Sequence, residues 1–443
     1  MMRFSCRLFV TSLLVLVGVF AQGCGRPLMA PPTIFDAGEI DPFFELPAEY
    51  RTGRVTVYYA TDRIDDDPGQ GNYGKRRGDT LDLGTCEVQI GREGDWHALE
   101  GFTNGGLHRS RPKVQIVQTH RLGDLFTTRR SPPTDPTDPS GPKIDETAKQ
   151  FLAGLNATIH ASSQQELTVF IHGYNTGFPA AIMSCAEYAH YAGNQGAFVC
   201  YSWPSHNNLF RYEYDIDSVR YTGTHLRQFV RFLAEHTDAK KINFVCHSSG
   251  CHAFGTLLRE LRLLTNHLPR EEAYARFRIG QVFLVAPDIN VDVARERVLE
   301  EGAADLFDHL TVYSSNFDFA LRYAARNLFY APRLGALSDG SLSDADLRWL
   351  GALDNVTLID IDSQRTRTLI GHMHQRYNPT VSSDILLMLR RDLAPEQRAL
   401  TREPGGHLWR FTADYDARIR ETVRMIYPAR IEREDRAQET RAD

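Results

Sequence analysis

The chain has 443 residues, of which 42% are apolar, so it can bury a large core as one decorated domain or as two ordinary ones. Its formal net charge is −6, and acidic and basic residues are mixed along the sequence without a long basic stripe. This distribution excludes the electrostatic footprint of a nucleic-acid-binding protein, so we expect no nucleic-acid partner.

The N-terminus has the layout of a secretory signal. Arg3 and Arg7 precede an apolar run from Leu8 to Phe20, and small residues follow the run up to Cys24. The run is shorter than the about 20 residues that a membrane-spanning helix needs, which favours a cleaved signal over a permanent anchor. We therefore predict a signal peptide over residues 1–23 and an exported protein.

A cysteine directly after the predicted cleavage point resembles the bacterial lipoprotein box, in which this cysteine is acylated. Ala21 and Gln22 depart from that pattern, so two outcomes stay open: lipidation of Cys24, which we favour, and Cys24 as a simple mature N-terminus. Residues 24–50 are rich in proline and are predicted to form a tether to a membrane of the cell envelope.

Five further cysteines remain after the leader is removed. Three of them lie in apolar stretches, where a small buried thiol is commoner than a disulfide, and no spacing resembles a zinc site. We predict neither a metal nor a cofactor. The five are Cys86, Cys185, Cys200, Cys246 and Cys251.

Two early runs of β-branched and aromatic residues, Arg54–Ala60 and Cys86–Ile90, predict strands that are separated by a loop over residues 65–78. Residues 131–142 contain five prolines and predict a surface loop. A helical pattern over residues 144–159 follows this loop.

From residue 167 onward, short apolar runs alternate with amphipathic helical patterns such as Tyr221–Glu235. Near-continuous apolar strands between helices are typical of a parallel sheet with both faces covered, so the predicted fold class is α/β. We assign residues 51–395 to this domain and residues 396–443 to a C-terminal extension with a charged, disordered end. The predicted strands are Leu167–Ile171, Ala197–Tyr201, Ile242–Cys246, Val282–Val285, Leu310–Tyr313 and Val356–Ile361.

Ser248 lies where one of these strands runs directly into a helical pattern. Small residues at Cys246 and Gly250 would let strand and helix approach, as a nucleophile at a strained turn requires. The alternative is that Ser248 or Ser249 only caps the helix. The hypothesis that Ser248 is a nucleophile is strengthened by candidate partner residues that follow other predicted strands.

Two backbone N–H groups are candidates for an oxyanion hole, those of Tyr174 and Ser249. Tyr174 follows the pair His172-Gly173 at the end of a predicted strand, and Ser249 follows the candidate nucleophile. Two such preorganised donors stabilise the charge that develops in acyl transfer. The bland alternative is that Gly173 merely turns the chain.

In one group of α/β enzymes, whose nucleophile lies at such a turn between strand and helix, the triad follows the chain order serine, acid, histidine. Asp318 is the preferred acid and Asp288 the alternative, while His372 is the preferred base and His374 the alternative. A metal site built from the two histidines and an aspartate is a further, disfavoured possibility. His372 would take the Ser248 proton and Asp318 would stabilise the resulting imidazolium.

Seven short motifs together resemble the bacterial α/β-hydrolase family of unknown function numbered 900. The resemblance extends from Arg54 to Leu393 and implies an α/β-hydrolase fold with the triad Ser248, Asp318 and His372. Cys246 and Ser249 depart from the family turn, which usually has Ala and Met there. The motifs are Val57–Arg63, His172–Asn175, Tyr201–Ser205, Cys246–Gly250, Ala286–Asp288, Tyr313–Asn316 and Gly371–His372.

The leading functional hypothesis is a carboxylic-ester hydrolase of the cell envelope, acting on a small-molecule ester or acyl substrate. A peptidase or amidase is one alternative, and a catalytically silent binding protein on the same scaffold is another. Aromatic residues after the strand that ends near Tyr201 could wall an acyl pocket or simply pack in the core. They are Trp203, His206, Tyr212 and Tyr214.

Overall fold

The computed structural model describes most of the chain, with gaps. The predicted signal peptide, Cys24, the proline-rich loop at 131–142 and the charged end from residue 430 onward lie outside the described residues. The described ranges are 25–35, 38–105, 110–127, 146–208, 211–337, 343, 353–363, 372–402 and 408–429.

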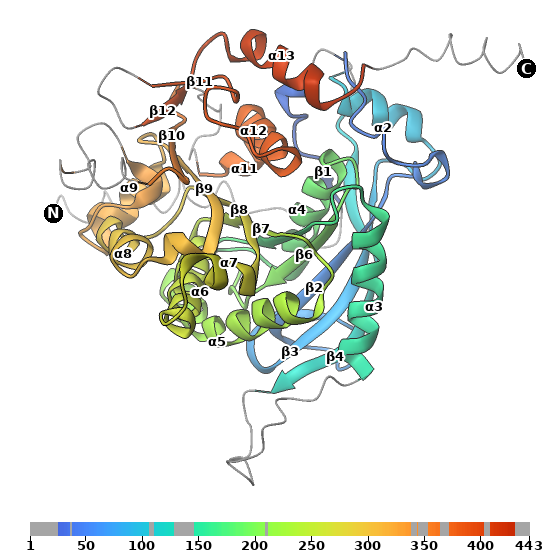
Figure 1. Ribbon diagram of the computed structural model, residues 1–443. Coiled ribbons are helices and arrows are strands. Elements are labelled where there is room, and N and C mark those ends of the chain that lie inside the picture. The colour runs from blue at the N-terminus through green and yellow to red at the C-terminus, as the bar shows by residue number, and fades with distance from the viewer. Residues whose placement is uncertain are drawn as a thin grey trace, which may run out of the picture.

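A twelve-stranded sheet runs through the molecule in the order β1-β4-β3-β2-β6-β5-β7-β8-β9-β10-β12-β11 (Figure 1). The strands from β2 to β12 in this order pair in parallel, whereas β1, β4, β3 and β2 pair antiparallel, as do β12 and β11. The strands are β1 Arg26–Pro27, β2 Arg54–Asp65, β3 Tyr73–Ile90, β4 Lys113–Thr127, β5 Leu167–Ile171, β6 Ala197–Ser202, β7 Ile242–His247, β8 Ile279–Val285, β9 Phe307–Ser314, β10 Val356–Asp360, β11 Leu400–Arg402 and β12 Trp409–Phe411.

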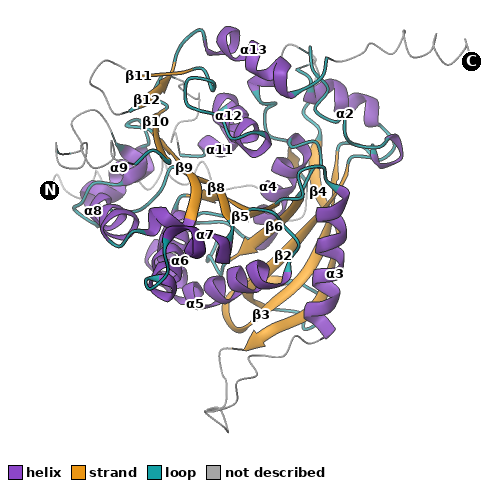
Figure 2. Ribbon diagram, in the orientation of Figure 1, coloured by secondary structure: helices purple, strands orange, loops and turns teal. Residues whose placement is uncertain are grey.

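Helices cover both faces of the sheet (Figure 2). One buried cluster packs side chains of α3, α5, α6 and α7 against one face, and a second packs α2, α4, α12 and α13 against the other. The helices are α2 Trp96–Thr103, α3 Glu146–Ala161, α4 Phe178–Tyr191, α5 Tyr212–His236, α6 Ser249–Thr265, α7 Arg270–Phe277, α8 Val291–Arg295, α9 Phe319–Tyr323, α11 His374–Tyr377, α12 Pro379–Arg390 and α13 Tyr415–Ile426. Single turns lie at Thr33–Phe35, Ala48–Tyr50, Glu296–Glu300, Ala303–Leu306, Ala324–Leu328 and Leu334–Ala336.

The central strands form because their apolar residues are buried on both faces. Every residue of β5, β6, β7 and β8 is buried, and neighbouring residues contribute to opposite clusters, as Val245 and Cys246 do. This is the pattern expected for parallel strands between two helical layers. The predicted α/β class, with a mostly parallel sheet, helices on both faces and extra N-terminal strands, is confirmed.

Beyond residue 25, the predicted tether does not stand off from the domain. Leu28, Phe35 and Phe43 are fully buried, β1 pairs with β4, and Ile40 forms a bridge with Ala429 close to α13 (Figure 1). The physical reason is that the prolines are interspersed with large apolar side chains, which gain more from burial than from solvation.

The domain also extends past its predicted C-terminal boundary. β11 and β12 add to the sheet, and α13 buries Tyr415, Ile419 and Val423. At the other end, β3 begins at Tyr73 within the predicted loop, and β4 was not predicted. These segments alternate polar and apolar residues weakly, so their pairing depends on neighbours that are distant in sequence.

All five cysteines of the described ranges are buried and unpaired. Burial raises the pKa of the thiols, that of Cys86 to about 12 and that of Cys246 well above its ordinary value. Among the helices of the described ranges, none has the length and apolar character needed to cross a membrane.

Candidate active site

Ser248 forms the turn between β7 and α6 in a strained backbone conformation, with φ 51° and ψ −121°. An L-residue adopts such angles only where its surroundings impose them. The Ser248 N–H donates to Val285 O at 3.0 Å, which fixes the turn to the neighbouring strand. A Cβ added to Gly250 would lie 2.5 Å from His172 O and 2.7 Å from Ile171 O, so only glycine permits this approach of α6 to β5.

The three preferred triad residues come together in one line of hydrogen bonds. His372 Nε2 lies 2.8 Å from Ser248 Oγ, and His372 Nδ1 lies 2.7 Å from Asp318 Oδ2. Asp318 follows β9, and His372 precedes α11, so both reach Ser248 from loops at the carboxyl end of the sheet. Ligand and catalytic sites of open α/β sheets lie at this end.

The surroundings of His372 favour its charged form. Burial works against the imidazolium, but the Asp318 carboxylate and its hydrogen bond outweigh burial, so the pKa of His372 is raised above its ordinary value. Asp318 is fully buried, and its second oxygen accepts from Leu321 N at 3.0 Å at the start of α9. One oxygen of Asp318 is therefore held by the start of α9, while the other orients His372.

The alternative acid, Asp288, has other partners. Its carboxylate lies 2.9 Å from Arg333 Nε and accepts from the Tyr212 hydroxyl, and its own N–H donates to Ser248 O at 3.2 Å. Asp288 thus stabilises the backbone of the Ser248 turn and does not contact His372 as Asp318 does.

The alternative base, His374, is buried at the start of α11. Its Nε2 is 3.9 Å from Asp318 Oδ2, and neither ring nitrogen has a hydrogen-bond partner within the described residues. Burial lowers the pKa of His374 to about 4, so the ring is neutral at neutral pH. It packs beside the Asp318 carboxylate, whereas His372 contacts both the acid and the serine.

The loop that carries Tyr174 lies directly against the nucleophile. A Cβ added to Gly173 would be 2.9 Å from Ser248 Cβ and 2.6 Å from His247 Nδ1. His172, the preceding residue, is buried and stacks on Trp203 with ring centroids 4.9 Å apart. Of the two predicted oxyanion residues, Ser249 therefore follows Ser248 in the chain, and Tyr174 follows Gly173, which lies against Ser248.

The aromatic residues predicted as a pocket wall divide into two groups. Trp203 is fully buried and donates from Nε1 to His172 O at 2.7 Å, so it supports the loop from within. Tyr212 instead makes edge contacts with Tyr174 at 5.2 Å and with Phe329 at 5.8 Å. Tyr174, Tyr212 and Phe329 thus form an aromatic row from the loop after β5 to the segment after α9.

Exposed apolar side chains concentrate in two segments of the chain, one that begins beside Asp318 and one that begins beside His372. Of the fourteen large apolar side chains that are exposed in the described residues, eight lie in the segments 317–330 and 373–377, which adjoin Asp318 and His372. Apolar clusters of this kind mark binding surfaces. The eight are Phe317, Phe319, Tyr323, Leu328, Phe329, Tyr330, Met373 and Tyr377.

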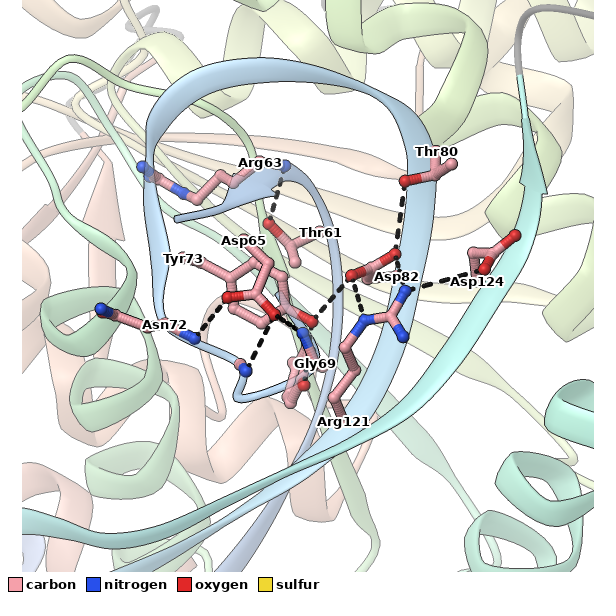
Figure 3. Close-up of polar contacts among 12 residues, drawn as sticks. Thr61, Arg63, Asp65, Gly69, Asn72, Tyr73, Thr80, Asp82, Arg121 and Asp124 are labelled. Carbon is pink, nitrogen blue, oxygen red and sulfur yellow. Dashed lines mark hydrogen bonds and ion pairs between the residues drawn. The ribbon is translucent and has the colours of Figure 1, made fainter. Parts of the chain in front are cut away.

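Sequence reasoning assigned no role to Arg63, although it ends one of the quoted motifs. Its guanidinium is buried and reaches the loop after β5, donating to Thr176 O at 2.9 Å. The tip of the hairpin that carries it is held by Asp65, which accepts from the N–H groups of Gly69, Gly71 and Asn72 (Figure 3). No signal in the sequence alone links this hairpin to a loop more than a hundred residues later.

A metal site from His372, His374 and an aspartate was a disfavoured prediction. Within the ranges that the structure describes, no group of three His, Cys, Asp or Glu side chains has an arrangement that could hold a metal ion.

One comparison with known proteins, that with family models, agrees with this fold. The model of a family described as alpha/beta hydrolase of unknown function (DUF900) matches residues 147–391, more than half of the chain. No curated protein matches the sequence. One solved structure similar to this chain is the salicylyl-acyltransferase SsfX3 from a tetracycline biosynthetic pathway, with 13% identity, a TM-score of 0.22, and coverage of 85% of this chain and 79% of that one.

Proposed function

Because this chain belongs to the alpha/beta hydrolases of unknown function, we propose that it is a serine hydrolase that cleaves carboxylic esters through an acyl-enzyme. The observation that carries the proposal is the line of hydrogen bonds from Ser248 through His372 to Asp318. A base within 2.6–3.2 Å of the nucleophile, itself oriented by a third group, is the signature of an activated serine.

In the proposed reaction, His372 Nε2 takes the proton of Ser248 as its oxygen attacks the ester carbonyl. The negative charge on the carbonyl oxygen is stabilised by the N–H groups of Tyr174 and Ser249. His372 then gives the proton to the leaving alcohol, and the serine ester remains. A water molecule that is activated by the same histidine releases the acid.

The apolar row beside the triad supports an ester with an apolar acyl or alkyl group as the substrate. Tyr174, Tyr212 and Phe329 form an aromatic row at the loop of the proposed oxyanion hole, and the segments beside Asp318 and His372 carry further exposed apolar side chains. A peptidase would need polar groups that pair with a peptide backbone. We therefore expect faster cleavage of butyrate and hexanoate esters than of acetate esters or peptide amides.

Labelling with a fluorophosphonate probe tests the proposal. We expect the folded protein to be labelled and to hydrolyse p-nitrophenyl esters, and Ser248→Ala to lose both properties. Ser163→Ala, which changes an exposed serine, is the matched control and should behave as wild type. A folded wild-type protein without labelling or esterase activity would support the second candidate, a silent binding protein.

We also propose that the protein is exported and that Cys24 is acylated. The support comes from the sequence of the leader alone. Metabolic labelling with a fatty acid should mark the wild-type protein but not Cys24→Ala, and equal labelling of the two would contradict the proposal.

A further inference from the structure

Arg63 lies at the end of β2, beyond the last residue pair that joins β2 to β6, Thr61 with Ser202. The strand therefore carries this side chain past the edge of the parallel sheet to the level of the loops that follow β5 and β6. Its side chain points away from the ion pair between Asp82 of β3 and Arg121 of β4 (Figure 3). Only 2% of Arg63 is exposed.

All five N–H groups of the Arg63 guanidinium have acceptors, which is the full capacity of the group. The acceptors come from the loop after β5, from the end of β6 and the loop after it, and from β3. None of them is a carboxylate. They are Ser202 Oγ at 3.0 Å from Nε, Gly74 O at 2.9 Å and Ser205 O at 3.1 Å from Nη1, and Thr176 O at 2.9 Å and His172 Nε2 at 3.3 Å from Nη2.

The contact between Arg63 and His172 bears on which ring nitrogen of His172 carries the proton. Burial, assisted by the nearby Arg63 charge, lowers the pKa of His172 to about 3, so the ring is neutral and carries one proton. Nε2 faces both the Arg63 donor and Trp203 O at 3.1 Å, while Nδ1 faces Gly173 O at 2.8 Å. Because Arg63 can only donate, we assign the proton to Nδ1, where it makes the shorter of the two bonds to a carbonyl.

The Gly173 carbonyl belongs to the same peptide unit as the Tyr174 N–H. A peptide unit is planar and trans, so a hydrogen bond that fixes the direction of its C=O also fixes the opposite direction of its N–H. His172 Nδ1 fixes the C=O, and Arg63 fixes His172. Arg63 also holds the other side of the loop at Thr176 O.

We propose that Arg63 is a positioning residue for the oxyanion hole: through His172 it orients the Gly173–Tyr174 peptide, whose N–H stabilises the oxyanion. The inference rests on the proposed hydrolase function. It means that the N-terminal hairpin, which lies before the family-matched segment 147–391, completes the catalytic site. Arg63 itself contacts no reacting atom.

The test compares Arg63→Met and Arg63→Lys with Arg77→Met. Arg77 is the matched control because it lies in β3 of the same hairpin but ties it to α5, donating to Ser218 Oγ at 2.9 Å and Tyr214 O at 3.0 Å. We expect Arg63→Met to lower kcat on p-nitrophenyl butyrate by about 100-fold, as loss of one oxyanion donor does, with KM nearly unchanged. Arg77→Met should stay within about threefold of wild type.

The readout that separates positioning from mere stability is the affinity for a trifluoromethyl ketone, which forms a tetrahedral adduct with an active serine. Its affinity should fall in parallel with kcat/KM, because both depend on the oxyanion hole. The pH midpoint of kcat/KM, which reports His372, should not move. If Arg63→Met does not fold, Arg63→Lys carries the test, since lysine keeps the charge but cannot supply five donors.

Wild-type kcat and inhibitor affinity in a folded Arg63 variant would overturn the inference while leaving the proposed function intact. So would a loss of kcat without a parallel loss of inhibitor affinity. If the wild-type protein neither hydrolyses esters nor reacts with a fluorophosphonate, the proposed function itself has failed. The two failures are therefore distinguished within one set of measurements.

Discussion

Gly250→Ala tests how far the site depends on the close approach of α6 to β5. The new Cβ would lie 2.5 Å from His172 O and 2.7 Å from Ile171 O, and both are backbone atoms that cannot rotate away. To restore an ordinary contact of about 3.4 Å, helix and strand must separate by about 0.9 Å. Overpacking of this kind costs about 1–3 kcal/mol of the free energy of unfolding.

The same separation would move the two proposed oxyanion donors apart, since Ser249 begins α6 and Tyr174 follows β5. A displacement of about 1 Å at a reacting centre can cost about 100-fold in rate. We therefore expect Gly250→Ala to lose both stability, measured by urea denaturation, and kcat/KM, measured on p-nitrophenyl butyrate. The loss of rate should persist at temperatures where the variant is fully folded.

Gly255→Ala, in the same helix, is the matched control. Its added Cβ would meet only Ile289 Cδ1 at 3.7 Å, an ordinary contact. Alanine is a better helix former than glycine, so this variant should gain about 0.5–1 kcal/mol and keep its activity. The reasoning is refuted if Gly250→Ala matches wild type in stability and rate, or if the two variants behave alike.

Three further outcomes are expected. Because the pKa of His372 is raised, kcat/KM should increase with pH as His372 loses its proton, with a midpoint above the ordinary value of 6.5. Asp318→Asn should lower that midpoint in a pH–rate profile. An unchanged midpoint would argue against the coupling of the two residues. His372→Ala should abolish activity, by about a million-fold in kcat, whereas His374→Gln should retain most of it, and the reverse would exchange the two assignments. Phe43→Ala should cost about 3–5 kcal/mol in urea denaturation because its ring is fully buried, and Phe44→Ala, whose ring is 37% exposed, should cost clearly less; equal effects would mean that the segment is not packed in solution.

The sequence predicted the central strands well because the burial that forms them is visible in each strand's own residues. Strands β5 to β10 read as apolar runs, since they are buried on both faces, and the structure has a strand at each of them. The edges were harder. β4 is long but mixes Gln, His and Arg with apolar residues, and the proline-rich start of the chain hides buried side chains such as Phe35.

The candidate site could be predicted only as far as chain order allows. Nucleophile, acid and base each follow a strand, so the choice of Ser248 and its order relative to the others came from the sequence. The sequence preferred Asp318 to Asp288, but which carboxylate reaches His372 is a tertiary fact: Asp318 contacts His372, whereas Asp288 pairs with Arg333. The role of Arg63 could not be predicted because most of its hydrogen-bond acceptors lie after β5 and at or after the end of β6, more than a hundred residues away.

The two borders of the sheet have a consequence for how chains of this protein associate. β1 contributes two residues, one of them Pro27 without an N–H, and β11 contributes three. The long strand β4 next to β1 pairs irregularly with β3, with three shifts of register. Short or irregular border strands are poor templates for a further strand, so we expect copies of this protein to resist joining their sheets into a continuous ribbon.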